Sequence, residues 1–258
     1  MDYCSLMSGS WGNCHYIRAG ETSILIDAGQ SGRRILANMT EAGCGPAESL
    51  SAIVVTHAHS DHISGLGVLA RRLGVEVYAT EGTWFEMGAL AGEIPDRQKK
   101  MIGCSERWAI GSLEMEAFPT SHDALESVGY VVRNSGNALG IATDSGVFTS
   151  HMERILRDMR VLVLEANHDL DMLRTGKYPR FLKKRIAGIE GHLSNDDAGQ
   201  ALVRVLGDHM EKVVLAHLSQ ENNTREKALE TVRCALPPGG PELSVAPRSQ
   251  PSGWIVMD

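Results

Sequence analysis

The sequence lacks the features that would place the protein in a membrane or in an oxidising compartment. No apolar run approaches the roughly 20 residues that cross a bilayer. The first ten residues, MDYCSLMSGS, lack a charged segment followed by an apolar one. The five cysteines are scattered and form no C-x-x-C pair, which favours buried, reduced thiols. We therefore expect a soluble, cytoplasmic protein that makes no membrane contact.

Positive charge is also scarce. The formal net charge is -7, so no global positive field attracts nucleic acid, and a local basic patch or bound cations would have to do so. What the chain does have is length and apolar content. Its 258 residues are 43% hydrophobic, which is enough for one sizeable core. We expect a single domain over residues 1–258.

Short apolar strands alternate along the chain with amphipathic helices. The predicted strands are 15–19, 22–27, 52–56, 75–79, 113–118, 128–133, 138–143, 161–166 and 212–217, with 244–246 and 254–257 as possible edge strands. The predicted helices are 31–43, 63–74 and 195–206, with further helical stretches to about residue 102. Hairpins mixed with β-α-β units predict an α/β fold with two sheets covered by helices.

Side chains that bind metals or protons stand where the predicted strands end. The motif THAHSDH (56–62) holds four of them within six residues: His57, His59, Asp61 and His62. The others follow an apolar run directly or after a short turn: Asp27, His122, Asp144 and His217. Strand ends gathered at one edge of a sheet can converge on a ligand, whereas isolated surface histidines show no such pattern.

The spacing of the motif suits two metals. In H-x-H-x-D-H the first two histidines project from an extended loop toward one metal, while Asp61 and His62, at the turn into a helix, can face a second. Two metals about 3.5–4 Å apart need a shared carboxylate and a bridging water. Asp144 is the natural bridge.

This ordered set resembles the metallo-β-lactamase superfamily, whose fold is an αββα sandwich of two mixed β-sheets flanked by helices. The resemblance implies that one metal is held by His57, His59 and His122. It implies that a second is held by Asp61, His62 and His217, with Asp144 as the bridge. In this fold Asp61 often touches the water nucleophile as well, which makes it a candidate catalytic residue. Asp27 supports the site by hydrogen bonding.

Four further stretches of the sequence reduce the range of possible substrates. SGSWGN (8–13), EANHD (165–169), GHLSN (191–195) and HLSQENN (217–223) together resemble the YycJ (WalJ) family of bacterial metallo-hydrolases. The match runs over nearly the whole chain, from about residue 3 to 245–248. Members of that family are exonucleases that degrade duplex DNA from the 5′ end, so the resemblance implies the same activity here. Trp11 is a departure from this resemblance, because we expect a small residue at this place.

Two further residues favour phosphodiester chemistry. Glu165 ends a predicted strand, and His192 opens the loop before a helix. A carboxylate paired with a histidine near two metals can protonate a leaving alkoxide, so both are candidate catalytic residues. Similar residues occur in the tRNA 3′-processing nucleases of the superfamily. The alternative for His192 is a surface residue beside a helix N-cap at Ser194 or Asn195.

One short stretch of the chain is strongly basic, although the chain as a whole has a net negative charge. RTGKYPRFLKKRI contains no acid and six basic residues: Arg174, Lys177, Arg180, Lys183, Lys184 and Arg185. It is either a solvated helix face or a patch for the phosphate backbone. Tyr178 or Phe181 could stack on a terminal base, although core packing would also explain them. The predicted substrate contacts are Ser10, Asn13, Lys183, Lys184, Arg185 and Asn195.

We therefore expect a dinuclear phosphodiesterase that binds two divalent ions (Zn, Mn or Fe) and acts as a 5′-to-3′ exonuclease on double-stranded DNA. A ribonuclease of the same fold is one alternative. A small-molecule ester, thioester or lactone hydrolase is another, and it has no use for the basic run or His192. A metal-dependent scaffold without turnover is the third. His168 is expected to shape its loop or to pack beside the site, and we expect three histidines at the surface: His15, His151 and His209.

Overall fold

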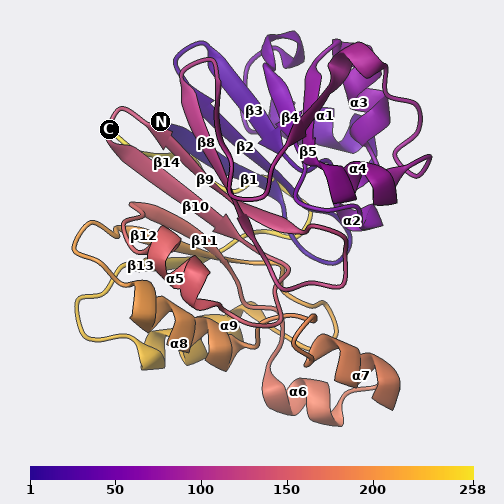
Figure 1. Ribbon diagram of the computed structural model, residues 1–258. Coiled ribbons are helices and arrows are strands. Elements are labelled where there is room, and N and C mark those ends of the chain that lie inside the picture. The colour runs from indigo at the N-terminus through magenta and orange to yellow at the C-terminus, as the bar shows by residue number, and fades with distance from the viewer.

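The computed structural model describes residues 1–258 and contains two sheets of seven strands each (Figure 1). In spatial order the first sheet contains β14 (Ile255–Val256), β1 (Asp2–Met7), β2 (Cys14–Ala19), β3 (Thr22–Ile26), β4 (Ala52–Val54), β5 (Glu76–Thr80) and β6 (Lys99–Ile102). The second contains β13 (Glu242–Val245), β12 (Lys212–Ala216), β11 (Val161–Glu165), β10 (Asn137–Ala142), β9 (Val128–Asn134), β8 (Leu113–Pro119) and β7 (Arg107–Ile110).

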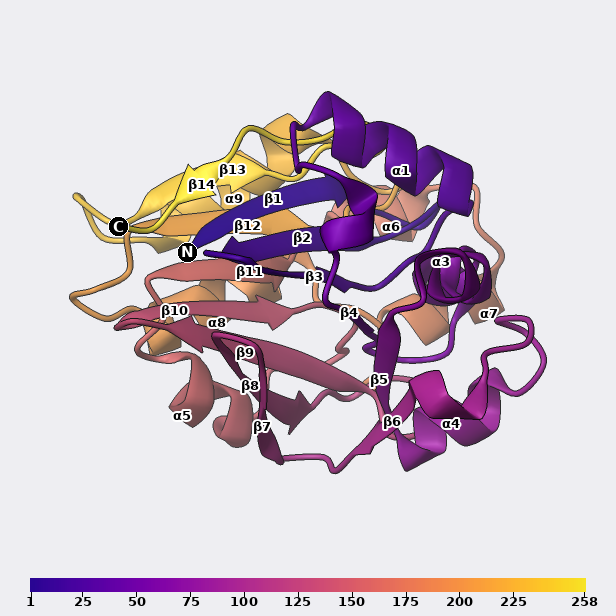
Figure 2. The same cartoon turned by 90° about the horizontal axis from the view of Figure 1, so that it is seen from above.

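Helices cover the outer face of each sheet (Figures 1 and 2). Those on the side of the first sheet are α1 (Gly32–Glu41), α2 (Ser60–Ile63), α3 (Leu66–Leu73) and α4 (Glu81–Met87). Those on the side of the second are α5 (Ser150–Leu156), α8 (Asn195–Val205) and α9 (Arg225–Ala235). Two short helices, α6 (Leu170–Thr175) and α7 (Arg180–Ile186), project from one end of the sandwich (Figure 1). None of the helices combines the length and the apolarity that a bilayer crossing requires.

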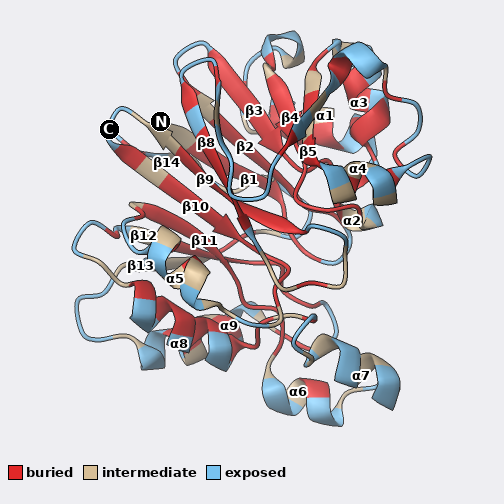
Figure 3. Ribbon diagram, in the orientation of Figure 1, coloured by how far each residue is buried: buried red, intermediate tan, exposed pale blue.

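Alternation of side chains along the strands produces three apolar layers. Every residue of β3 is buried. Ile24 and Ile26 lie in the layer between the two sheets, while Leu25 points the other way, into the layer under α1 and α3. The third layer lies between the second sheet and its helices, where Leu202 of α8 and Val232 of α9 are fully buried. The fold is therefore the predicted αββα sandwich, in which inner strands such as β3 and β11 are buried on both faces (Figure 3).

The direction of the strands determines where the site forms. Strands β3 to β6 run parallel in the first sheet, and β10 to β13 run parallel in the second. Strand β8 is antiparallel to β9, which is antiparallel to β10, so β8 and β10 share a direction. Because the carboxyl ends of such strands lie at the same edge of a sheet, the loops that follow them can meet.

The predicted strands are confirmed, with ends that shift by a residue or two. The structure adds three strands that the sequence analysis did not find: β1, β6 and β7. The prediction that helical stretches reach about residue 102 is wrong at its end, because residues 99–102 form β6 and pair with β5.

Several predictions of exposure are corrected by the structure. His15 is buried in β2, where its Nδ1 lies 2.9 Å from the Tyr3 hydroxyl, so the prediction of a surface residue is wrong. His209 is exposed, as predicted, and His151 is half-buried. All five cysteines are free. Three of them are buried as predicted, whereas Cys104 and Cys234 are exposed.

Candidate metal centre

Loops from both sheets meet at one edge of the sandwich and bring the seven predicted metal ligands together. Their nitrogen and oxygen atoms form overlapping groups whose members all lie within 4.8 Å of one another: His57, His59 and His122; His57, His62 and Asp144; Asp61, His62 and His217; and Asp144, Glu165, His192 and His217. The ends of five strands, the short helix α2 and the loop before α8 supply these residues. The first and third groups match the two ligand sets that the sequence predicts.

Three imidazoles converge at the first group. The ring centroids of His57, His59 and His122 are 4.7–4.9 Å apart. Nδ1 of His122 donates to the carbonyl of Gly191 at 3.1 Å, so its Nε2 faces Nδ1 of His59 at 3.2 Å. Nε2 of His57 is buried and has no hydrogen-bond partner. Burial and the neighbouring histidines hold the pKa of His57 well below its usual value, which favours a neutral ring with a free lone pair.

A carboxylate and two imidazoles form the second group. Oδ2 of Asp61 lies 3.5 Å from Nε2 of His62 and 3.4 Å from Nε2 of His217. Nδ1 of His62 donates to Oδ2 of Asp27 at 2.7 Å, which leaves Nε2 facing the centre. Although burial lowers the pKa of His62, the carboxylates of Asp27, Asp144 and Asp61 raise it well above its usual value. This pocket of negative charge favours a bound cation.

Asp144 lies between the two groups. Its Oδ2 is 3.4 Å from Nε2 of His62, and its Oδ1 is 3.8 Å from Nε2 of His122. Oδ2 is also buried without a hydrogen-bond partner. A buried charged oxygen without a partner is costly, and a cation between the two groups would satisfy it. Unpartnered donor atoms on imidazole and carboxylate, aimed at a common centre, fit divalent metal ions.

The backbone is strained where three site residues leave their strands. Asp27, Asp144 and His217 follow β3, β10 and β12 and have φ values of 64°, 58° and 55°. Left-handed conformations cost non-glycine residues on the order of 1–3 kcal/mol and tend to gather at functional sites. Here they turn the chain sharply at the edge of the sheet, and they allow each side chain to reach the centre.

A close contact between loops supports this geometry. The amide of Asn13 donates to the carbonyl of Asp61 at 2.8 Å, and the amide of Gly29 donates to the carbonyl of Asn13 at 2.9 Å. A Cβ at Gly29 would lie 1.7 Å from the Asp61 carbonyl oxygen, so only glycine fits there. Nδ2 of Asn13 lies 3.3 Å from Oδ2 of Asp61 and 3.1 Å from Nε2 of His62. Asn13 is buried and holds the loop, and its predicted contact with substrate stays a prediction.

Glu165 and His192 form the predicted pair. Oε1 of Glu165 accepts from Nδ1 of His192 at 2.7 Å and also from Nδ1 of His217 at 3.0 Å. Oε2 accepts from the amides of Ser145 and Leu193 at 3.1 and 3.2 Å. Burial would raise the pKa of Glu165, but His192 and His217 lower it, so the carboxylate stays ionised. The contact with His217 was not predicted, and it makes Glu165 a positioning residue for two histidines.

A cavity of about 240 Å³ opens above these side chains. Nε2 of His192 has no hydrogen bond to the protein, and the side chain lines this cavity. Helix α7 forms one wall with Leu182, Arg185 and Ile186. Nε of Arg185 donates to Oδ2 of Asp123, whose Oδ1 lies 3.6 Å from Nε2 of His122. The sequence analysis did not identify Asp123, although an acid directly after a predicted ligand was the available signal.

The other predicted substrate contacts fall in different places. Ser10 and Arg185 line the cavity, whereas Lys184 is exposed on α7 outside it. Nζ of Lys183 donates to the carbonyls of Arg174 and Gly176 at 2.9 and 2.6 Å and joins α6 to α7. Asn195 is fully buried against Asn223, and its predicted contact with substrate stays a prediction.

Three aromatic predictions can also be placed. Tyr178 lines the cavity. Phe181 is exposed on α7, so core packing is wrong for this residue. His168 is buried and its backbone pairs with that of Ser194, which agrees with a role in packing beside the site.

Comparisons with known proteins agree with this architecture. Residues 22–218 match the model of the β-lactamase superfamily domain. The crystal structure of the metallo-β-lactamase fold protein YhfI from Bacillus subtilis superimposes with a TM-score of 0.76 at 16% identity, covering 98% of this chain and 99% of that one. The fold and its groups of histidine and aspartate define a metal-dependent hydrolase of the metallo-β-lactamase type.

Two relatives of known name place the chain more closely within this class of hydrolases. The chain is 40% identical over 236 residues to exodeoxyribonuclease YycJ of Bacillus anthracis, covering 92% of this chain and 89% of that protein. It is 39% identical over 232 residues to exodeoxyribonuclease WalJ of Streptococcus pneumoniae, covering 89% and 86%. The chain therefore belongs to the metallo-β-lactamase superfamily and, within it, to the family of YycJ and WalJ.

Proposed function

We propose that this chain is a 5′-to-3′ exonuclease that acts on double-stranded DNA with two divalent metal ions. The observation that carries the proposal is the Glu165–His192 pair, which stands beside the metal ligands with one free imidazole nitrogen at the cavity. A poor alkoxide leaving group needs such a proton donor. The two curated relatives are named exodeoxyribonucleases, which supports DNA as the substrate.

We assign one metal position to His57, His59 and His122 and the other to Asp61, His62 and His217, with Asp144 between them. When bound, two such ions lower the pKa of a water nucleophile and offset the charge of the phosphate. Imidazole and carboxylate ligands suit Zn, Mn or Fe.

We assign the other steps of the reaction, orienting the water and protonating the leaving group, to three residues of the chain. Asp61 lines the cavity and accepts a hydrogen bond from the attacking water, which it orients toward phosphorus. His192 enters the reaction protonated and donates the proton on Nε2 to the leaving oxygen as the P–O bond breaks. Glu165 accepts from Nδ1 of His192 throughout, which fixes the ring and leaves Nε2 directed at the cavity. Glu165 is buried and acts through His192.

The test is a substrate panel. Protein loaded with Mn or Zn is incubated with duplex DNA labelled at either end, single-stranded DNA and RNA, and with ester, thioester and lactone substrates. We expect nucleotides to be released stepwise from the 5′ ends of the duplex. Faster degradation of RNA would make the enzyme a ribonuclease instead. Hydrolysis of a small ester, thioester or lactone without any nucleolysis would overturn the proposal.

A further inference from the structure

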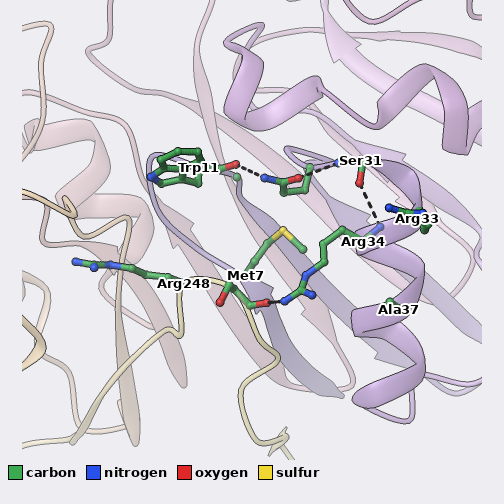
Figure 4. A pocket seen from close by; sticks show the side chains of 10 residues that line it. Met7, Trp11, Ser31, Arg33, Arg34, Ala37 and Arg248 are labelled. Atoms are coloured by element: carbon green, nitrogen blue, oxygen red, sulfur yellow. Dashed lines mark hydrogen bonds between the residues drawn. The ribbon is translucent and has the colours of Figure 1, made fainter.

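A second cavity adjoins the same Gly/Ser loop that borders the metal centre (Figure 4). Ser10 lines the cavity above the metal ligands, and the next residue, Trp11, lines the second one. The second cavity has a volume of about 550 Å³ and is formed by this loop, the first turns of α1 and the segment after β13. Ser10 and Trp11 are neighbours in the chain, and consecutive Cα atoms are about 3.8 Å apart. A long ligand that crosses this loop can therefore reach both cavities.

The second cavity is strongly positive. Three arginines line it, Arg33, Arg34 and Arg248, and none of its lining residues is acidic. None of the three forms an ion pair, although the whole chain has a net charge of -7. Arg34 donates to the carbonyl of Ser249, and Arg248 donates to that of Ser219 at 2.9 Å. These bonds hold two guanidinium groups in place without neutralising them.

The amino end of α1 adds to this charge. The helix has ten residues and begins after Ser31, whose side chain caps it by accepting from the amide of Arg34. Its first turn contains no acid. A helix amino end that no side chain neutralises favours an anion.

An aromatic side chain stands at the rim of this positive cavity. The side chain of Trp11 is 71% exposed, whereas the other three tryptophans are only partly exposed. Its backbone is held in place, because Nε2 of Gln30 donates to the Trp11 carbonyl at 2.8 Å and Oε1 of Gln30 accepts from the amide of Ser31 at 3.1 Å. The chain therefore presents a large planar surface to solvent from an anchored loop (Figure 4).

We propose that this second cavity binds the nucleotides next to the scissile bond, with a base stacked on Trp11 and phosphates paired with Arg33, Arg34 and Arg248. The proposal rests on the proposed nuclease function. Aromatic surfaces beside cationic grooves bind nucleic-acid strands, because every base has a π face and every linkage has a charge. The cavity offers both an aromatic face and positive charge, and a polynucleotide that extends from the metal centre past Ser10 matches both.

Trp11 supplies a direct optical test. Chelator-treated protein is titrated with a 5′-phosphorylated single-stranded dodecamer and with the matching duplex, while tryptophan emission and oligonucleotide anisotropy are recorded. We expect emission to be quenched on binding. In Trp11→Phe the quenching should disappear while affinity is retained, because phenylalanine still stacks. Trp11→Ala should weaken binding about five-fold or more. Phe85→Ala, which removes an aromatic side chain that is 80% exposed on α4, should leave affinity unchanged.

The arginines are tested by salt dependence. Arg33 is exposed near the start of α1 and lines the second cavity, so Arg33→Ala is expected to remove charge without disturbing the fold. It should reduce the slope of log affinity against log salt by about 0.7 for a single strand and about 0.9 for a duplex. Arg72→Ala, at an exposed position on α3, should leave the slope unchanged.

The outcomes separate this proposal from the nuclease function. In cleavage assays Trp11→Ala should raise KM with kcat unchanged, and Trp11→Phe should restore KM. If the parent cleaves DNA but neither KM, quenching nor salt slope responds to these variants, the second cavity is not a nucleotide site and the nuclease function stands. If the parent shows Trp11-dependent quenching but cleaves no nucleic acid, the second cavity is a nucleotide site and the proposed function fails.

Discussion

Asp144 occupies the position at which a single residue can reach both predicted metal sites. Its two oxygens lie 3.4 Å from Nε2 of His62 and 3.8 Å from Nε2 of His122. We predict that Asp144→Ala loses at least one of two bound ions, because a shared carboxylate serves both. Elemental analysis of purified protein measures this directly. Asp171→Ala, which removes an exposed acid on α6, should keep both ions. Full occupancy in Asp144→Ala would show that Asp144 is not the bridge.

His15 should make the folded state sensitive to acid. Burial, helped by the charges of His62 and His217, lowers the pKa of His15 to about 3, compared with about 6.5 in an unfolded chain. Below about pH 6.5 the unfolded chain therefore binds a proton here that the folded chain does not. Stability should fall as pH falls, by up to about 1.4 kcal/mol per pH unit.

The measurement compares variants at two pH values. Urea unfolding of chelator-treated protein at pH 6.5 and pH 5 should show a smaller loss of stability for His15→Leu than for the parent, by about 1–2 kcal/mol. Tyr3→Phe removes the neighbouring hydroxyl but keeps the buried imidazole, so it should lose as much as the parent. Equal losses in His15→Leu and the parent would mean that His15 does not carry this effect.

For single residues, the sequence predicts the side chains that belong to a recognisable motif. It does not predict which polar and aromatic side chains are buried or exposed. The seven predicted ligands were identified because each is a metal-binding residue type that follows a strand or stands in the H-x-H-x-D-H motif, and the structure brings them together. Asn13 and Asn195 are polar residues in conspicuous loops, and only the packed structure shows that their side chains are consumed by internal hydrogen bonds. The exposure of Phe181 likewise depends on α7 lying outside the core.

Helix α7 has no buried residue and forms part of the wall of the cavity. Two of its basic residues, Arg180 and Lys184, are exposed and form no ion pair, unlike Arg185, which is bonded to Asp123. We predict that Arg180→Ala with Lys184→Ala flattens the salt dependence of duplex binding, by about 0.9 in slope for each phosphate that the variant no longer neutralises. Metal content should not change.

The control for α7 also removes two positive charges. Arg72→Ala with Arg154→Ala changes exposed residues on α3 and α5 and should leave the salt slope as in the parent. If the α7 variant keeps the parent slope as well, the helix is a solvated face and takes no part in binding the phosphate backbone.

Two of the three strands that the sequence analysis missed, β6 and β7, share a physical cause. Strands β6 and β7 are the edge strands of their sheets, and they begin with KK and RW. Edge strands often carry charged side chains that prevent pairing with other chains, so their apolar pattern is weak. Strands such as β3 and β11 are buried along their whole length and read clearly as apolar runs.

At the scale of the whole molecule, the two sheets place distant segments in one centre. His62 comes from the first sheet's side and His217 follows a strand of the second, and both approach Asp61. The sequence predicts the layers because hairpins and β-α-β units have recognisable patterns. It could not place the second cavity, because this cavity forms only when α1, the loop 8–13 and the segment after β13 pack together.

The central claim is that this architecture protonates the leaving group of a phosphodiester through His192. An alkoxide needs that proton, and general-acid help is typically worth about 10²–10⁴ in rate. A nitrophenolate is stable near neutral pH and needs little protonation. His192→Ala should therefore lose about that factor in kcat on duplex DNA while it keeps much of its activity on bis(p-nitrophenyl) phosphate.

The decisive measurement is this pair of kcat values at matched metal loading, since loss of metal would imitate loss of the acid. Glu165→Gln should show the same pattern more mildly at matched metal loading, because Glu165 positions His192 and His217 and does not itself donate the proton. Selective loss on DNA is the result that the account predicts. Equal losses on both substrates would mean that His192 binds phosphate instead, and an unchanged rate on DNA would contradict the account.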